Sequence, residues 1–339
     1  MGRAHARAYE NHELTEVVAA ADPDDETRGN FAEAHGVDET FETYEPMLER
    51  VDLNVVSVCT WHSTHARMTV DAAEQGVEGV FCEKPMCTDM GEARAMVEAA
   101  DRNDVVLTVG HQRRYDPVHE KAHELVADGA VGEPRFVSTG HRDGLLNWGT
   151  HLVDLTRYVL GDPETAWVVG QVERETDRYE RGVPIEDRCL GQVCFEGGTR
   201  LSLEMDLPEP DLGERQIEVH GSSGSLRLGL GEEVTVRNED GTATYAPERD
   251  VSSRFSYLDD MVAVMDGAEH EHRCSAHQAR QTIEILMSIY ESARTNSVVQ
   301  TPLRTLSNPL QHMVENGELE PEHPGEYDIR IPYRGIDDS

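Results

Sequence analysis

A lysine stands between Glu83 and Pro85, directly after the apolar segment Gly79–Cys82. Such a segment predicts a buried strand, and ligands bind at the carboxyl ends of strands in open α/β sheets. Oxidation of a secondary alcohol needs a group that takes the hydroxyl proton while hydride goes to a nicotinamide. A lysine can do this, because desolvation and a nearby positive charge favour its neutral form, whereas an arginine keeps its proton. We predict that Lys84 is catalytic; the alternative is a surface ion pair with Glu83.

His151 and Asp154 lie three residues apart at the start of a predicted helix, Thr150–Leu160, and therefore share one helix face. An imidazole can take a substrate proton at neutral pH, and a carboxylate can orient that imidazole or a neighbouring group. The alternative for His151 is a structural histidine with satisfied ring nitrogens. The spacing makes His151 a second candidate for proton transfer.

Asp22 follows the predicted strand Leu14–Ala21 and stands 20 residues after Gly2. In a dinucleotide-binding domain, the glycine-rich turn holds the pyrophosphate, and an acidic residue about 20 positions later holds the adenosine ribose. A carboxylate at this position repels a 2′-phosphate, and no arginine follows it closely, so we predict NAD rather than NADP. The alternative for Asp22 is a helix N-cap or a turn residue in Asp22-Pro23-Asp24.

The first hundred residues alternate short apolar segments with amphipathic ones. The expected helices are Met1–Asn11, Asp24–His35, Thr64–Gln75 and Met90–Arg102, and the expected strands are Leu14–Ala21, Asn54–Cys59, Gly79–Cys82 and Val105–Val109. This alternation predicts a doubly wound domain with a parallel sheet covered on both faces. Its first strand and first two glycines are absent, because the chain opens at Met1-Gly2-Arg3, and we expect the native start to lie upstream.

The pattern changes after Gly110. Helices are expected at Val118–Ala127, Thr150–Leu160 and Ala276–Arg294, and strands at Arg135–Thr139, Gly191–Phe195, Arg200–Met205, Gln216–His220 and Ser225–Leu230, the last two forming a hairpin. Consecutive strands predict an α+β domain with a large, mostly antiparallel open sheet. The expected organisation is a first domain at 1–112, a second at 113–300, and a tail at 301–339 packed on the body.

Composition excludes several classes of protein. The 339 residues carry 66 acidic and 30 basic side chains, a formal charge of −36, and only Lys84 and Lys121 are lysines. Such a charge argues against nucleic acid and anionic membranes as partners, and no apolar run reaches the roughly 20 residues of a membrane span. We interpret the dispersed acids as the surface of a halophilic, cytoplasmic protein rather than as a site for cationic partners. The six cysteines form no close pair and are expected to be reduced thiols, and no metal site is predicted.

The chain resembles the Gfo/Idh/MocA family of NAD(P)-dependent sugar and polyol oxidoreductases over nearly its whole length. The shared motifs, in order, are Met1–His5, Glu83-Lys84-Pro85 preceded by Thr60 and His65, Gly110–Pro117, Gly149–Asp154 and the Gly221–Gly224 turn. The resemblance implies a Rossmann domain followed by an open-sheet domain that often forms the oligomer interface, here a homodimer or homotetramer. It also implies hydride transfer between a sugar carbon and the nicotinamide.

The resemblance assigns roles to individual residues. The catalytic pair it implies is Lys84 and His151; the cofactor would be bound by Gly2, Asp22, Thr60, His65, Glu83, Lys84 and Gln112, and the substrate side supported by Asn147, Trp148, Asp154 and Arg113. Asn147 departs from the family, since many relatives carry an aspartate there and an amide cannot relay a proton. Trp61-His62 replaces a Pro-Asn pair. Trp61 and Trp148 can flank a sugar or simply pack, and one of Arg113 and Arg114 is expected in a salt bridge.

We therefore predict an NAD-dependent oxidoreductase that acts on a sugar, polyol or inositol-like secondary alcohol. Two alternatives remain open. Asn147 and the incomplete glycine turn suggest a cofactor-binding regulator without turnover. The second alternative is an NAD-using glycosidase of the same family, which cleaves a glycosidic bond through transient oxidation.

Overall fold

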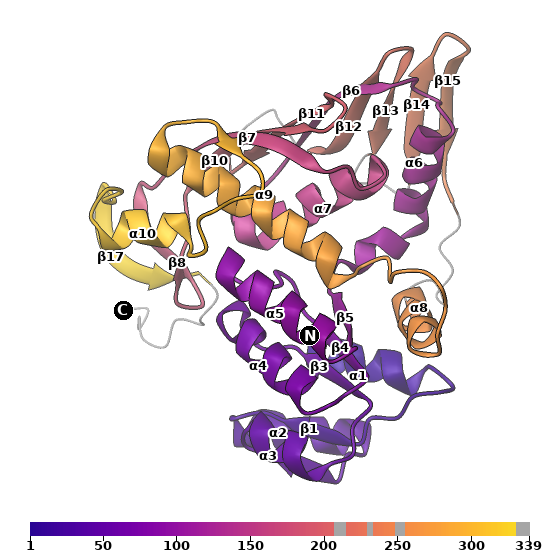
Figure 1. Ribbon diagram of the computed structural model, residues 1–339, viewed down its shortest axis with the longest axis vertical. Coiled ribbons are helices and arrows are strands. Elements are labelled where there is room, and N and C mark those ends of the chain that lie inside the picture. The colour runs from indigo at the N-terminus through magenta and orange to yellow at the C-terminus, as the bar shows by residue number, and fades with distance from the viewer. Residues whose placement is uncertain (207–214, 229–232, 248–254, 330–339) are drawn as a thin grey trace, which may run out of the picture.

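The computed structural model describes residues 1–206, 215–228, 233–247 and 255–329. Figure 1 shows a small α/β part that contains the N-terminus, a wide sheet at the opposite end, and the long helix α9 between them.

The N-terminal part alternates helices and strands. Its elements are α1 (Gly2–Glu10), β1 (Ala19–Ala21), α2 (Asp25–His35), β2 (Glu39–Phe41), α3 (Tyr44–Arg50), β3 (Val55–Val58), α4 (His62–Glu74), β4 (Gly79–Cys82), α5 (Met90–Arg102) and β5 (Val106–Val109). Strands β3, β4 and β5 are parallel, with Val58 paired to Cys82 and Cys82 to Val109. Every residue of β4 is buried, as expected for a strand covered on both faces. The predicted doubly wound parallel sheet is confirmed.

Strand β1 differs from its prediction. It contains only Ala19–Ala21, because its partner β2 offers three residues for pairing and no other described strand extends the ladder. The predicted strand residues Leu14 and Val18 are 73% and 40% exposed, so the prediction was wrong for Leu14–Val18. The sequence pattern also missed β2 and α3. The β1–β2 pair and the β3–β4–β5 sheet are separate sheets.

The second part is built on a nine-stranded sheet with the order β15-β14-β13-β12-β6-β11-β10-β7-β16. Its strands are β6 (Pro134–His141), β7 (Thr165–Glu173), β10 (Arg188–Phe195), β11 (Arg200–Met205), β12 (Arg215–Gly221), β13 (Gly224–Leu228), β14 (Val234–Asn238), β15 (Gly241–Tyr245) and β16 (Val299–Gln300). Only β6 and β11 pair in parallel, so the mostly antiparallel sheet is confirmed. The β12–β13 hairpin is also confirmed, while Gly229 and Leu230 of its predicted second strand lie outside the described residues.

Helices cover one face of this sheet. They include α6 (Pro117–Ala127), the π-helical turn η2 (Gly144–Gly149), which continues into α7 (Thr150–Val159), and α9 (Ala276–Thr295). Helix α9 packs so close to the strands that a Cβ atom at Gly170 of β7 would lie 2.6 Å from the side chain of Ile289. The opposite face exposes Phe136, Val169 and Leu190, each about two-fifths accessible.

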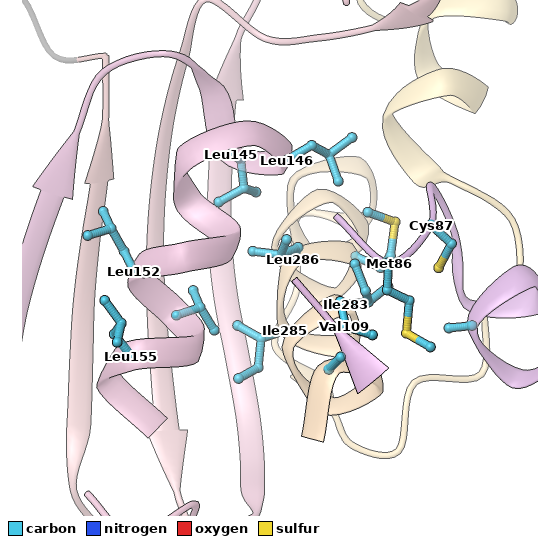
Figure 2. Packing of buried hydrophobic residues seen from close by; sticks show 14 of the residues in the cluster. Met86, Cys87, Val109, Leu145, Leu146, Leu152, Leu155, Ile283, Ile285 and Leu286 are labelled. Carbon is cyan, nitrogen blue, oxygen red and sulfur yellow. The ribbon is translucent and has the colours of Figure 1, made fainter. Parts of the chain in front are cut away.

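Helix α9 joins the two parts. Figure 2 shows Leu286 of α9 near Leu145, with Ile283 toward the segment that contains Met86, while Leu152 points from α7 toward the strands of the sheet. These side chains belong to one continuous hydrophobic cluster. The loop after β4 and the turn η2 are therefore fixed relative to each other by burial against the same helix.

The C-terminal segment takes part in the core. After α8 (Ser256–Met265) and α9, the chain forms α10 (Pro309–Glu315) and β17 (His323–Asp328), which pairs with β8 (Thr176–Glu180), itself joined to β9 (Val183–Pro184). Leu303, Leu310 and Met313 are buried in the main cluster, so this segment does more than lie on the surface. The six cysteines are free thiols, and within the described residues no helix is long and apolar enough to span a membrane.

Candidate active site

The side chain of Lys84 meets Asn147 from the other part of the molecule. Its Nζ atom donates to Oδ1 of Asn147 at 2.9 Å and to the backbone oxygen of the same residue at 3.1 Å. Lys84 stands two residues past β4, and Asn147 lies in η2. The predicted alternative, a surface ion pair between Lys84 and Glu83, is wrong, because Glu83 is only 5% exposed.

Glu83 is held by the N-terminal helix. Nε2 of His5 lies 2.8 Å from its Oε1 atom, and Nδ1 of His5 lies 3.0 Å from Oγ of Ser57. Burial opposes ionisation of this carboxyl, but the hydrogen bond and charge of His5 keep the pKa of Glu83 below its usual value. The backbone N–H of Lys84 also donates to Glu83, at 3.2 Å. Glu83 thus anchors the loop that carries the lysine.

Two carboxylates hold the turn that carries Asn147, and sequence reasoning missed both. Asp206 accepts from the backbone N–H groups of Asp143 and Gly144, at 2.8 and 2.7 Å. Glu186 accepts from the N–H of Leu145 and from the hydroxyl of Tyr290, both at 2.7 Å. Glu186 is fully buried, and burial raises its pKa. Their positions in the chain carry no local motif, because the contacts cross 41 to 104 residues.

His151 lies four residues beyond Asn147, on the first turn of α7. Its side chain is 9% exposed, and its Nδ1 atom has no hydrogen-bond partner among the described residues. Burial, followed by the positive charges of Lys84 and of neighbouring basic groups, lowers the pKa of His151 well below its ordinary value. The imidazole is therefore neutral at pH 7 and can accept a proton. The structure brings Lys84, Asn147 and His151 together.

Asp154 orients a neighbour rather than His151. Both of its carboxylate oxygens accept from Arg114 at 2.8 Å, and Oδ1 lies 3.3 Å from Nδ1 of His111. The other ring nitrogen of His111 lies 3.0 Å from Oγ1 of Thr150. Burial opposes ionisation of Asp154, but Arg114 keeps its pKa below the usual value. The salt bridge expected for one of the two arginines thus belongs to Arg114.

Aromatic and basic groups surround His151. The ring of Trp148 stacks on His141 at 4.1 Å and lies 5.6 Å from the ring of His151. The guanidinium carbon of Arg113 lies 4.8 Å above Trp148. Trp61 is 49% exposed and lies immediately before α4.

Gly2 is the first residue of α1, and Asp22 directly follows β1. Asp22 forms a turn, since its Oδ1 accepts from the N–H of Asp24 at 2.9 Å. The N-cap alternative is wrong for Asp22, because Asp24 caps α2. No arginine was expected close to Asp22, but Arg28 donates to its backbone oxygen at 2.6 Å.

The remaining predicted cofactor residues follow β3 and β5. The ring nitrogens of His65 lie 2.9 Å from the oxygen of Pro85 and 3.2 Å from that of Thr60, so this histidine ties the loops after β3 and β4 together. Oγ1 of Thr60 lies 2.8 Å from that of Thr64. Oε1 of Gln112 is buried and has no partner among the described residues, so it is available to a ligand.

These residues fit a nicotinamide dinucleotide. The loops after the parallel strands β3, β4 and β5 end at one edge of the sheet, which is where open α/β sheets bind ligands. Several buried polar atoms at this edge, among them Oε1 of Gln112 and Nδ1 of His151, have no partner among the described residues. This arrangement of fold and sheet edge is typical of a nicotinamide-dependent oxidoreductase.

Comparison with known proteins identifies the family. Residues 1–111 match the NAD-binding Rossmann domain of the Gfo/Idh/MocA oxidoreductase family, and residues 129–301 match its C-terminal α/β domain. The chain belongs to this family.

Three similar proteins illustrate the relationship. The D-apiose dehydrogenase of Paraburkholderia graminis is 24% identical over 88% of this chain and 86% of its own. The myo-inositol 2-dehydrogenase of Thermotoga maritima is 24% identical over 76% of this chain and 79% of its own. A structure of levoglucosan dehydrogenase with NADH and levoglucosan superposes with a TM-score of 0.77 at 21% identity, covering 89% of this chain and 97% of that one.

Proposed function

We propose that this chain catalyses hydride transfer between a secondary alcohol of a sugar or polyol and NAD, with Lys84 and His151 handling the hydroxyl proton. Its relatives include a D-apiose dehydrogenase, two inositol dehydrogenases and a 1,5-anhydro-D-fructose reductase. The observation that carries the proposal is the contact of the Lys84 amine with Asn147, four residues before His151.

Each residue has a defined task in this proposal. Bound NAD supplies the hydride acceptor. The oxygens of Asn147 fix the nitrogen of Lys84, which takes the hydroxyl proton. The neutral imidazole of His151 hydrogen-bonds the same hydroxyl or passes its proton on. The pair of Asp154 with Arg114 holds helix α7, which carries His151.

The test uses the two lysines of the chain as a matched pair. NADH absorbance is measured in high salt with a panel of polyols and sugars, for the parent protein, Lys84→Met and Lys121→Met. Lys121 lies on α6 and pairs with Glu124 at 2.9 Å, away from the proposed site. Lys84→Met is expected to lower kcat about 10²- to 10⁴-fold, whereas Lys121→Met retains activity. Full activity of Lys84→Met would show that the base is another group.

The same assay separates the two alternatives. A regulator binds NADH without turning over any alcohol. A glycosidase hydrolyses a glycoside without net NADH formation. The Lys84–Asn147 contact favours the dehydrogenase over the regulator, because a sensor has no need for an amine fixed at this edge.

The proposal also covers the choice of cofactor, the oligomeric state and the location of the protein in the cell. The carboxylate of Asp22 supports NAD over NADP. The apolar side chains Phe136, Val169 and Leu190 on the open sheet face support a homodimer or homotetramer, which light scattering in high salt measures. The charge of −36 supports a salt-rich cytoplasm and argues against nucleic-acid and membrane partners.

A further inference from the structure

His62, the first residue of α4, is buried without hydrogen bonds. Its side chain is 2% exposed, and neither ring nitrogen has a partner among the described residues. Buried polar atoms in native proteins are nearly always paired, and an unpaired one calls for a ligand, an ion or a water. Helix α4 also begins without a side-chain cap or an acidic residue in its first turn, so its N-terminal N–H groups favour an anion.

His62 lies at the same sheet edge as Lys84. Val58 and Cys82 are paired in register, and the chain reaches His62 four residues after the first and Lys84 two residues after the second. Burial is the main cause that lowers the pKa of His62 to about 4, and His65, Arg181 and Lys84 contribute in that order. At pH 7 the ring is therefore neutral, with one N–H donor and one acceptor nitrogen.

Arg181 lies at the turn between β8 and β9, where its φ of 53° and that of 82° at Gly182 form a tight hairpin. It makes no hydrogen bond or ion pair with any residue within the described ranges, although acidic residues outnumber basic ones by 66 to 30. Its positive charge contributes to lowering the pKa of both His62 and His65. Figure 1 shows the β8 hairpin reaching from the sheet domain toward the N-terminal part.

One acidic group also faces His62. Asp328, at the end of β17, raises the pKa of the imidazole, and its carboxylate accepts from the N–H of Gly182 at 2.6 Å. Asp328 is thus engaged at the hairpin, while His65 is held by backbone oxygens. Around His62 the cationic groups, Arg181 and Lys84, outnumber this carboxylate.

We propose that His62, Arg181 and the N-terminus of α4 form a subsite for a carboxylate of the substrate, beside Lys84. The inference rests on the proposed function and narrows its substrate class from sugars and polyols to polyhydroxy carboxylic acids. Arg181 supplies the charge and a planar pair of donors, and His62 donates one N–H. The other ring nitrogen of His62 accepts a hydrogen bond from a hydroxyl group of the same molecule.

The experiment compares acidic with neutral substrates. Initial rates are measured with D-gluconate and D-galacturonate against D-glucose and myo-inositol, and NADH affinity is measured by fluorescence. The variants are Arg181→Leu, His62→Phe and His62→Gln, with Arg227→Leu as a control that removes an arginine 70% exposed on β13. The glutamine in His62→Gln keeps a hydrogen-bond donor and an acceptor, and Arg181→Leu changes a residue in a hairpin turn. The test therefore does not depend on whether His62→Phe folds.

The expected result is a preference for the acids in the parent protein. The quantity compared is kcat/KM for the acids divided by kcat/KM for the neutral compounds. Arg181→Leu and His62→Phe lower this ratio about tenfold or more, and His62→Gln lowers it less. Arg227→Leu leaves it unchanged. Turnover of neutral compounds only, or an equal loss for both classes, overturns the subsite and leaves the proposed function standing. Weaker NADH binding in Arg181→Leu also overturns it, because the anion would then be the cofactor's pyrophosphate. If no compound is oxidised, the proposed function fails, and calorimetric titration of D-gluconate into the NADH-bound protein still decides the subsite.

Discussion

The Nζ atom of Lys84 lies 2.9 Å from Oδ1 of Asn147 and 3.1 Å from its backbone oxygen, although 63 residues separate the two in the chain. From the sequence alone, Asn147 puts a proton relay in doubt, because an amide cannot relay a proton. In the proposed mechanism the amide has another task, which is to position the amine.

Substitution of Asn147 tests this positioning. Asn147→Ala removes the contact with Oδ1 but keeps the one with the backbone oxygen, so we expect kcat to fall about tenfold with little change in NADH affinity. Asn147→Asp places a carboxylate against the amine, which favours its charged form, so the pH optimum for alcohol oxidation should rise by about one unit or more. Both effects are read from pH–rate profiles. Asn103→Ala, on the exposed end of α5, is the control. An unchanged profile for Asn147→Asp would contradict the contact.

Asp154 should matter for stability more than for chemistry. Removing its charge leaves the buried guanidinium of Arg114 without its main partner, which costs about 3–5 kcal/mol of unfolding free energy. Asp162 also binds Arg114 but is 24% exposed, so Asp162→Asn should cost less. Denaturant unfolding of both variants measures the difference. A large loss of kcat in Asp154→Asn without any loss of stability would instead assign Asp154 to catalysis.

Cofactor preference should depend on Asp22. Its carboxylate repels a 2′-phosphate, so the parent protein is expected to use NAD at least about tenfold better than NADP, and Asp22→Ser should narrow that ratio. Arg28 donates to the backbone oxygen of Asp22 and lies close enough to attract a phosphate once the carboxylate is gone. The double variant Asp22→Ser/Arg28→Leu should therefore use NADP less well than Asp22→Ser. Equal kcat/KM for the two cofactors in the parent protein would refute the role of Asp22.

Buried histidines should make stability depend on pH. The pKa of His62 is lowered to about 4, and those of His111 and His151 are lowered as well, mainly because burial disfavours the charged ring. The unfolded chain takes up protons near pH 6.5 while the folded chain does not, so stability is fully present above 6.5 and falls as pH drops toward 4. For His62 alone, the loss at pH 5 is about 2 kcal/mol. Unfolding at pH 7.5 and 5 in the same salt measures it, and His62→Gln should show a smaller decrease.

Local pattern was sufficient for much of the fold. Short apolar segments such as Gly79–Cys82 predict a buried parallel strand. The hairpin at 216–228 was predicted from two strand-like segments on either side of a polar turn. The pattern failed where pairing decided the outcome: Leu14–Val18 has strand composition but no ladder partner, and the short β2 carries too few residues for a signal.

Site residues divide along the same line. Lys84, His151 and Asp22 could be proposed from the sequence, because each follows a recognisable strand or opens a helix. Glu186, Asp206 and Arg28 were missed because their contacts depend on how distant segments fold. The residues next to a carboxylate in the sequence do not show which N–H group will donate a hydrogen bond to it.

The amino-acid order by itself determined that parallel strands would carry an amine to one edge of a sheet, since side-chain period and strand ends are local properties. Only the tertiary structure decided what that amine meets, that Asp154 serves Arg114, and that the rings of His62 and His151 lie buried without full partners. The reason is that burial against α9 joins two distant segments, and both the distances and the desolvation arise from that packing.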